Sequence, residues 1–256
     1  MKTILRRLGN KSKLIPSLLP LFPKHETYIE SHFGTGSVFF DKPQAKYNIL
    51  NDLDSDIFNL FMVIKNKKTK KQLQKAFYEM PIHKDLLDYW KKNKETDPIQ
   101  KACRFLLLSN FTFMGGGNIL RLENQNIKQI FYKSLGRTHE LLTNASFSNT
   151  DASKFINSIS YKSDPKRCFC YCDPPYLDTV NNYSDGYTEE LSRELIETLI
   201  SKEINFGMSE FDNPVILALA EEYGLEVHYI GERRNLGNRR MEIYVCNYKT
   251  NQLKMF

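Results

Sequence analysis

The run Asp173-Pro174-Pro175-Tyr176 carries the side chains in this chain that are best suited to chemistry. It follows an apolar stretch, residues 168–171, which predicts a buried strand. Two successive prolines cannot continue a hydrogen-bonded ladder, because neither has an N–H to donate. The sequence therefore predicts a stiff turn at the carboxyl end of a strand, which is where ligands bind in open α/β sheets.

This turn is suited to binding a planar amine. The Asp173 carboxylate and the Pro174 carbonyl are acceptors, and an exocyclic amino group has two hydrogens to donate. Tyr176 offers a ring face on which a heterocycle can stack. The alternative is a rigid turn whose Asp173 only caps the next element, so the rest of the chain must decide between the two.

A glycine loop is predicted at residues 32–36, between a strand at 28–30 and a helix that begins at Ser37. Gly34 and Gly36 let the backbone approach a ligand closely, because no Cβ stands in the way. The third glycine position of a phosphate-binding loop is Phe39 here, so the ligand need not carry a pyrophosphate. A nucleoside with a charged tail fits better.

Acidic and basic residues stand at other predicted element ends. Asp52 follows an apolar run eighteen residues after Gly34, which is the position of an acid that binds ribose hydroxyls. Asp151 ends another strand-like alternation and could accept a hydrogen bond from an adenine amino group. Lys11 falls near a predicted helix start, where a ligand carboxylate would explain it, although a surface lysine is the alternative.

The composition is that of an ordinary globular protein, with 256 residues, 41% hydrophobic and 26% charged. No apolar run approaches the roughly 18 residues of a membrane span, and we find no signal peptide, so a cytoplasmic protein is expected. Five cysteines, an odd number, argue against a disulfide framework. Their spacing lacks a second ligand cluster for zinc, so no metal is expected.

The positive charge is concentrated in the middle of the chain. Residues 60–145 hold 16 Lys and Arg against 7 Asp and Glu, whereas the remainder has a net charge of −3. Helical patterns at 70–78, 82–92 and 98–109 are too many for a strand crossover. We therefore predict an inserted, mainly helical domain at 59–144 that binds a polyanion, between two parts of the sheet domain at 1–58 and 145–256.

Three further segments could lie at a binding site. Residues 111–122 resemble a hairpin that could present Asn118 or Arg121 to a groove, or could pack on the insertion instead. Residues 177–187, which include Tyr183, form a plausible lid. A basic loop at 233–240, with Arg239, would suit phosphates, although a solvated loop is nearly as good an interpretation.

Taken in order, these motifs resemble the D12 class of DNA adenine-N6 methyltransferases, the group that includes the Dam methylases. Residues 7–11 resemble the N-terminal cofactor motif of the family, residues 33–39 its F-x-G-x-G motif, and residues 51–56 its acidic motif. Residues 173–176 resemble its catalytic motif, and Asn182-Tyr183 the aromatic segment that follows. The insertion between glycine loop and catalytic motif is the α-type order.

The resemblance implies a Rossmann-like α/β fold with a mostly parallel sheet and a reversed last strand. It implies S-adenosylmethionine as cofactor, with Lys11 at its methionine carboxylate, Asp52 at its ribose and Asp151 at its adenine. The full set of cofactor-binding residues that it implies is Arg7, Lys11, His32, Phe33, Gly34, Gly36, Asp52, Asp151 and Asp173.

Double-stranded DNA is the implied partner, with a cognate restriction endonuclease as a further one. This sequence departs from the pattern of the family at two places. Glu30-Ser31-His32 stands where many relatives have Glu-Pro-Phe, and residues 110–140 lack the Asn-Val-Pro-Phe-Gly-Arg run of Dam. A GATC target is therefore not implied.

The expected mechanism is direct methyl transfer to a flipped adenine. Tyr176 stacks on the base, Asp173 and the Pro174 carbonyl accept from N6, and neither a covalent intermediate nor a metal is needed. Cytosine-N4, RNA-adenine and protein-glutamine methylation are the rival reactions. A catalytically silent DNA-binding protein is the rival of another class, and the intact Asp173, Tyr176 and Lys11 argue against it.

Overall fold

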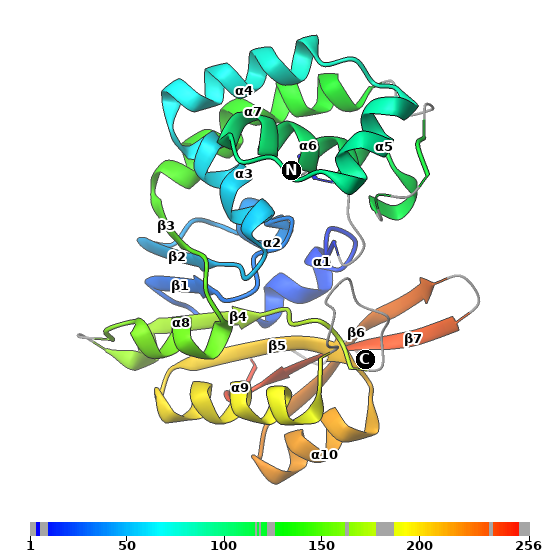
Figure 1. Ribbon diagram of the computed structural model, residues 1–256. Coiled ribbons are helices and arrows are strands. Elements are labelled where there is room, and N and C mark those ends of the chain that lie inside the picture. The colour runs from blue at the N-terminus through cyan, green and yellow to red at the C-terminus, as the bar shows by residue number, and fades with distance from the viewer. Residues whose placement is uncertain are drawn as a thin grey trace. The chain divides into compact units, whose positions relative to one another are not determined.

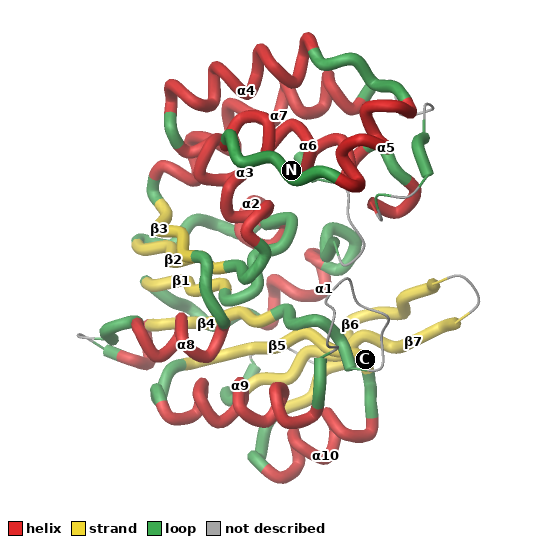
Figure 2. Tube along the Cα trace, viewed as in Figure 1, coloured by secondary structure: helices red, strands yellow, loops and turns green. Residues whose placement is uncertain are grey.

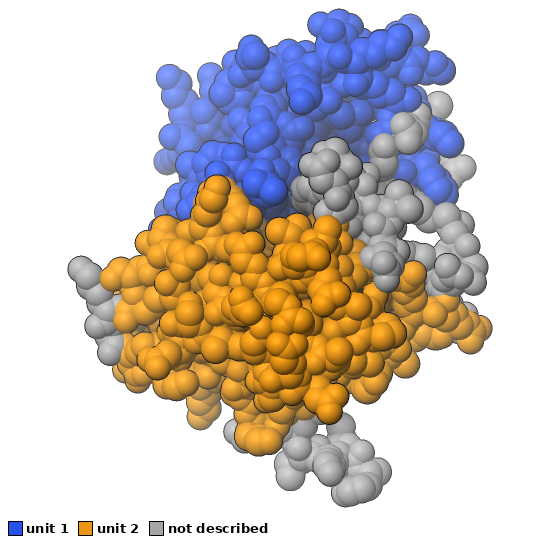
Figure 3. Space-filling view, turned by 60° about the horizontal axis from the view of Figure 1, so that its bottom comes forward, with its two compact units in different colours: residues 1–12, 34–42, 52–149 blue, residues 13–33, 43–51, 150–256 orange. Residues whose placement is uncertain are grey.

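The computed structural model describes residues 4–5, 10–115, 117, 119–121, 126–161, 164–177, 187–235 and 238–250. The chain forms two compact units, coloured separately in Figure 3. Unit 1 comprises residues 1–12, 34–42 and 52–149, and unit 2 comprises residues 13–33, 43–51 and 150–256.

The strands form a sheet in the order β3-β2-β1-β4-β5-β7-β6 (Figure 1). Their bounds are β1 Thr27–Glu30, β2 Tyr47–Asn51, β3 Ala145–Ser148, β4 Cys168–Cys172, β5 Asn205–Phe211, β6 Glu226–Asn235 and β7 Asn238–Cys246. Strand β1 pairs in parallel with β2 and β4, and β4 pairs in parallel with β5. Strand β7 runs antiparallel to both β5 and β6. The predicted α/β fold with a reversed last strand is confirmed.

Alternation along β4 explains how both faces of the sheet in unit 2 are covered. Cys168, Cys170 and Cys172 share one face with apolar residues of α8 (Ala152–Ser158), α9 (Glu189–Ser201) and α10 (Pro214–Glu222). Phe169 and Tyr171 point to the other face, where their rings lie 4.6 and 5.4 Å from that of Phe22. All five residues of β4 are buried.

All five cysteines of the chain are buried and free. The short helix α1 (Ile15–Leu18) carries Pro16 in its first turn, where a missing N–H costs nothing, and a 3-10 turn at Leu19–Leu21 follows.

Unit 1 is mainly helical (Figure 2). Its helices are α2 Ser37–Asp41, α3 Ser55–Lys65, α4 Lys67–Glu79, α5 Lys84–Lys92, α6 Pro98–Asn110 and α7 Ile127–Thr143. Side chains of Asp54, Asn66, His83 and Asp97 accept hydrogen bonds from first-turn N–H groups of α3 to α6. The predicted helices at 70–78, 82–92 and 98–109 are confirmed as α4, α5 and α6, whereas α7 was not predicted.

The segment after α6 contains a short antiparallel contact. Thr112 and Leu120 form an isolated bridge, the Phe113 N–H bonds the Ile119 carbonyl at 2.8 Å, and a 3-10 turn covers Phe113–Gly115. The described residues thus pair as a hairpin would.

The loop predicted at 233–240 was wrong in its extent. Strand β6 continues to Asn235 and β7 begins at Asn238, so that Arg233 is paired with Arg240 and Arg234 with Arg239 in the ladder (Figure 1). Antiparallel pairing uses backbone groups, so the run of arginines does not end the strands.

Within the described part of the chain, no helix is both long and apolar enough to cross a membrane.

Candidate cofactor and target-base site

The carboxyl ends of β2, β1 and β4 lie level in the sheet. Glu30 is the register partner of Leu50 in β2 and of Tyr171 in β4. Beyond the ladder, the Phe33 N–H bonds the Asn51 carbonyl at 2.9 Å and the Ser31 N–H bonds the Tyr171 carbonyl at 3.2 Å. The chain therefore leaves three adjacent strand ends into the glycine loop, the acidic segment and the Asp-Pro-Pro-Tyr run.

In unit 1, the glycine loop and the acidic segment are joined through Asp52. Its Oδ2 accepts the Gly34 N–H at 2.6 Å and its Oδ1 accepts the Asp54 N–H at 2.8 Å. Gly34 and Gly36 have φ values of 53° and 68°, and Gly36 is the N-cap of α2. A buried carboxylate thus holds a loop in a conformation that favours glycine.

The residues of this loop fit a nucleoside cofactor. A Cβ built on Gly34 would meet no heavy atom within 4 Å, so the loop is open on that side. The Asp52 carboxylate is the kind of acceptor that binds ribose hydroxyls. Lys11 is buried, and its backbone N–H donates to Ser37 Oγ at 3.2 Å. This lysine therefore lies beside the start of α2.

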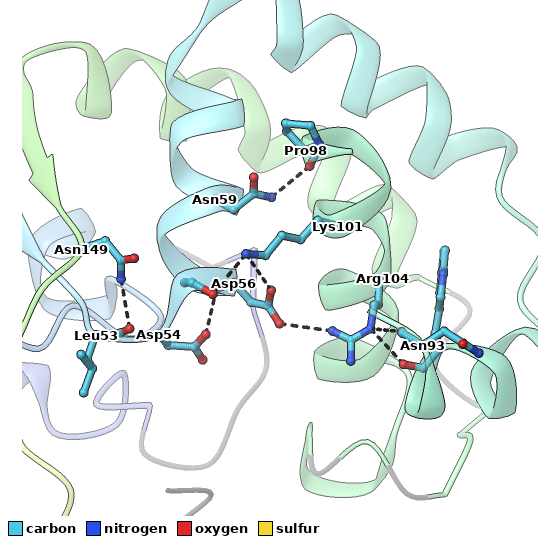
Figure 4. A network of polar contacts seen from close by, with 11 residues as sticks. Leu53, Asp54, Asp56, Asn59, Asn93, Pro98, Lys101, Arg104 and Asn149 are labelled. Carbon is cyan, nitrogen blue, oxygen red and sulfur yellow. Dashed lines mark hydrogen bonds and ion pairs between the residues drawn. The ribbon is translucent and has the colours of Figure 1, made fainter. Parts of the chain in front are cut away.

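The acidic segment also connects to the helices of unit 1 (Figure 4). Asp54 caps α3, while the Asp56 carboxylate lies 3.2 Å from Arg104 and 3.4 Å from Lys101, both on α6. Arg104 Nε also donates to the carbonyls of Trp90 and Asn93, at 2.9 and 3.0 Å. The segment that contains Asp52 is therefore anchored to α3, α5 and α6.

The Asp-Pro-Pro-Tyr run in unit 2 leaves the end of β4 as predicted. Asp173 is half-buried and Pro174 is buried, whereas Pro175 is half-buried. Tyr176 is buried, donates its hydroxyl to Glu242, and packs edge-on against Phe211 with ring centroids 4.6 Å apart. Burial, together with the charges of Asp173 and Glu242, raises the pKa of Tyr176 well above its ordinary value, so its hydroxyl stays protonated.

Sequence reasoning missed two buried glutamates beside this run. Glu242 on β7 accepts from Tyr176, and Glu210 on β5 accepts the Leu177 N–H at 3.0 Å. Neither glutamate is exposed to solvent. Their signal in the sequence is a glutamate next to an apolar residue within a predicted buried strand, which is costly unless the carboxylate has a partner.

A polar cluster fixes the last residue of β4. The Ser31 hydroxyl donates to Cys172 Sγ at 3.1 Å, so its oxygen must accept from His32 Nδ1 at 2.9 Å. Burial alone would raise the pKa of Cys172, but hydrogen bonds from Cys170, His32 and Ser31 outweigh it and lower the pKa below its ordinary value. The cluster holds the backbone immediately before Asp173.

Asp151 caps α8 by accepting the Lys154 N–H at 3.0 Å, and its side chain is half-buried.

Among the expected DNA contacts, Arg121 is exposed with its guanidinium 5.0 Å from the ring centre of Phe113. Arg239 is exposed and lies 3.6 Å from Glu232. The predicted residues Arg7, Asn118 and Tyr183 lie outside the described residues.

One group of possible metal ligands occurs in the described ranges, namely Glu226, His228 and Cys246 at the β6 edge. Lys249 and the Thr250 N–H already contact the Glu226 carboxylate, at 3.1 and 3.2 Å. This group lies outside the residues predicted to take part in methyl transfer.

The strand order with β7 reversed, and the glycine and acidic segments at the strand ends, define a class of protein, the Rossmann-like S-adenosylmethionine-dependent methyltransferases. The family model for D12 class N6 adenine-specific DNA methyltransferase matches residues 8–235, and the chain belongs to this family. Its cofactor is accordingly S-adenosylmethionine.

Known proteins are similar over most of the chain. The DNA adenine methylase of Salmonella typhi is 26% identical over 93% of this chain and 90% of its own length, and that of Escherichia coli K12 is 25% identical over the same shares. Modification methylase StsI of Streptococcus sanguinis is 24% identical over 98% of this chain and 43% of its own length.

A solved structure, the rRNA methyltransferase aviRa from Streptomyces viridochromogenes, matches 96% of this chain and 90% of its own. The TM-score is 0.45 and the identity 8%.

Proposed function

We propose that this protein transfers a methyl group from S-adenosylmethionine to the N6 amino group of adenine at specific sites in duplex DNA. The observation that carries the proposal is the Asp173-Pro174 pair at the end of the buried strand β4, followed directly by a tyrosine that is fixed through its hydroxyl. Together with family membership, this arrangement supports an amine as the acceptor of the methyl group.

The Asp173 carboxylate and the Pro174 carbonyl accept hydrogen bonds from the adenine amino group. Two acceptors direct its two hydrogens and leave the nitrogen lone pair free to attack. The amine is itself the nucleophile, so transfer proceeds in one displacement, in which the new N–C bond forms as the sulfonium–methyl bond breaks and the thioether leaves. The extra proton on N6 is then lost to solvent, and most of the acceleration comes from positioning. The Tyr176 ring stacks on the base, which must leave the helical stack to reach these groups.

The bound cofactor supplies an electrophilic methyl group on a sulfonium. Asp52 accepts from its ribose hydroxyls, Asp151 from its adenine amino group, and Lys11 binds its carboxylate. Gly34 and Gly36 let the loop approach it, and His32 and Phe33 line the same turn. Asp52 and Asp151 each bond a backbone N–H, which orients the carboxylate before the cofactor arrives.

The helical residues 59–144 form the DNA-recognition domain, and Arg121 and Arg239 contact the nucleic acid. The surplus of positive charge at residues 60–145 supports this role, because phosphate contacts dominate DNA affinity. A role as the modification partner of a restriction endonuclease is favoured by the similarity to modification methylases from Streptococcus sanguinis and Lactococcus lactis.

The test is transfer of labelled methyl groups to unmethylated genomic DNA, followed by sequencing that detects N6-methyladenine. We expect modification at one short sequence motif. Asp173→Ala should lower the transfer rate by at least about 100-fold, because the amine loses an acceptor that aligns it. Labelling of RNA alone, of cytosine, or of DNA by Asp173→Ala at the wild-type rate would contradict the proposal.

A further inference from the structure

Two buried glutamates, Glu210 and Glu242, hold the chain at the end of the Asp-Pro-Pro-Tyr run. They do so from opposite faces of the sheet in unit 2. Phe211 on β5 and Glu242 on β7 are register partners, so their side chains share one face, and Tyr176 contacts both of them. Glu210 precedes Phe211 and therefore points to the other face, where Leu177 lies in the core with Met208 and Ile243. The peptide between Tyr176 and Leu177 thus crosses from one face to the other at the end of β5.

The contacts at this crossing are specific. The Tyr176 hydroxyl donates to Glu242 Oε1, and the Leu177 N–H donates to Glu210 Oε1 at 3.0 Å. The second oxygen of Glu210 accepts the Phe211 N–H at 2.7 Å. Each glutamate therefore binds one part of the crossing, Glu242 the tyrosine ring and Glu210 the backbone behind it.

The complete burial of these two carboxylates needs a physical explanation. Both are 0% exposed, and a charged group removed from water costs free energy that good partners only offset. A hydrophobic pair of similar volume would pack the same strands. The Glu242 carboxylate instead gives the Tyr176 hydroxyl a directional acceptor, which an apolar side chain would not supply.

We propose that Glu242 is a positioning residue for methyl transfer, which sets the plane of the Tyr176 ring, and that Glu210 fixes the backbone that follows. The ring plane determines the angle at which the target base stacks, and hence the direction from which its amino nitrogen meets the methyl group. Neither glutamate touches the reacting atoms. This inference rests on the proposed function of Tyr176.

The experiment compares wild type, Tyr176→Phe, Glu242→Gln, Glu242→Leu, and the double variant Tyr176→Phe with Glu242→Leu. Exposed Glu221 on α10, changed to Gln, is the matched control. For each protein we would measure kcat and KM on DNA, the Kd of S-adenosylmethionine, and the emission of 2-aminopurine placed at the target base. Stacking quenches that emission, so it reports the contact between ring and base.

Glu242→Leu and Tyr176→Phe should each lower kcat by about 100-fold and raise the 2-aminopurine emission, with cofactor Kd unchanged. The double variant should be no worse than either single one, because both remove the same interaction. Glu242→Gln keeps an acceptor oxygen and should recover most of the activity.

Two outcomes would overturn the inference: effects that multiply in the double variant, or a folded Glu242→Leu with wild-type kcat and emission. If Glu242→Leu does not fold, a Tyr176→Phe variant with wild-type kcat and emission overturns it equally. A wild-type protein that methylates no DNA is a different result, since it refutes the proposed function before any variant is compared.

Discussion

Asp52 holds Gly34 by a hydrogen bond from the Gly34 backbone N–H to its Oδ2, at 2.6 Å. This bond joins the loop after β1 to the segment after β2, two parts of the chain that are 18 residues apart. The acceptor is the buried Asp52 carboxylate, and the donor N–H belongs to Gly34, whose φ is 53°. The bond therefore stabilises a loop conformation that only glycine adopts easily.

Replacing Asp52 by Asn should weaken cofactor binding. The amide keeps the size of the side chain but loses the charge, so both the loop and the ribose hydroxyls bond a weaker acceptor. We expect the Kd for S-adenosylmethionine, measured by calorimetry, to rise about 10- to 100-fold. Asp164→Asn, an exposed N-cap far along the chain, is the control. An unchanged Kd in Asp52→Asn would remove Asp52 from the cofactor site.

Gly34→Ala distinguishes backbone strain at this position from steric obstruction of the cofactor. The added Cβ meets no protein atom within 4 Å, so the change costs only the positive φ, about 1–2 kcal/mol of unfolding free energy. If the cofactor lies against Gly34, its Kd should rise much more than this loss of stability would suggest. Urea unfolding and calorimetry on the same preparation provide the comparison. A variant that loses stability but binds cofactor normally would show that the open side of Gly34 faces no ligand.

The link between Asp56 and Arg104 should matter for stability. Arg104 makes an ion pair and two carbonyl hydrogen bonds with only 11% of its side chain exposed (Figure 4). Arg104→Ala leaves Asp56 and the two carbonyls with fewer partners, and should cost about 3 kcal/mol of unfolding free energy. Arg137→Ala, at an exposed pair on α7, should cost about 0.5 kcal/mol or less. Equal losses in the two variants, measured by urea unfolding, would contradict this assignment.

Acid should selectively weaken the attachment of residues 249–250 to β6. Partial burial raises the pKa of Glu226, but Lys249, the Thr250 N–H and His228 outweigh it, so the pKa lies below its ordinary value of 4.5. A depressed carboxyl pKa adds stability above the ordinary value, and this is lost as the pH falls through the folded pKa. The stability gap between wild type and Glu226→Gln should therefore be full at neutral pH and close in acid.

Urea midpoints of both proteins at several pH values between about 7 and 3 would test this. Glu221→Gln serves as the surface control. A gap that persists at the lowest pH would mean that Glu226 acts through packing, and not through its charge.

Arg121 and Arg239 should contribute to DNA affinity through phosphates. Each replacement by Ala should weaken binding similarly for all sequences and reduce the slope of log affinity against log salt by about one. The measurement is a salt titration on target and non-target duplexes. Loss of discrimination at one base pair, with an unchanged slope, would instead indicate direct readout of a base by that arginine.

Local patterns predicted most of the elements, and the failures have physical causes. Helix α7 carries Ile127, Phe131 and Leu135 at intervals of four, a helical spacing that was present but hidden beside the hairpin signal. The arginines of residues 233–240 resembled a loop because of their charge. They extend β6 and β7 instead, because hydrogen bonding in a ladder does not depend on side-chain polarity.

By itself the sequence determined the chemistry that is local in the chain. The stiff Asp173-Pro174-Pro175-Tyr176 turn and the loop with Gly34 and Gly36 depend on proline rings and missing Cβ atoms, which act within a few residues. The tertiary structure alone decided which acceptors hold these segments. Tyr176 and Glu242 are 66 residues apart, and Leu177 and Glu210 are 33 apart. Such pairs arise from strand register and from the partners that a buried charge requires, and neither is encoded in a short motif.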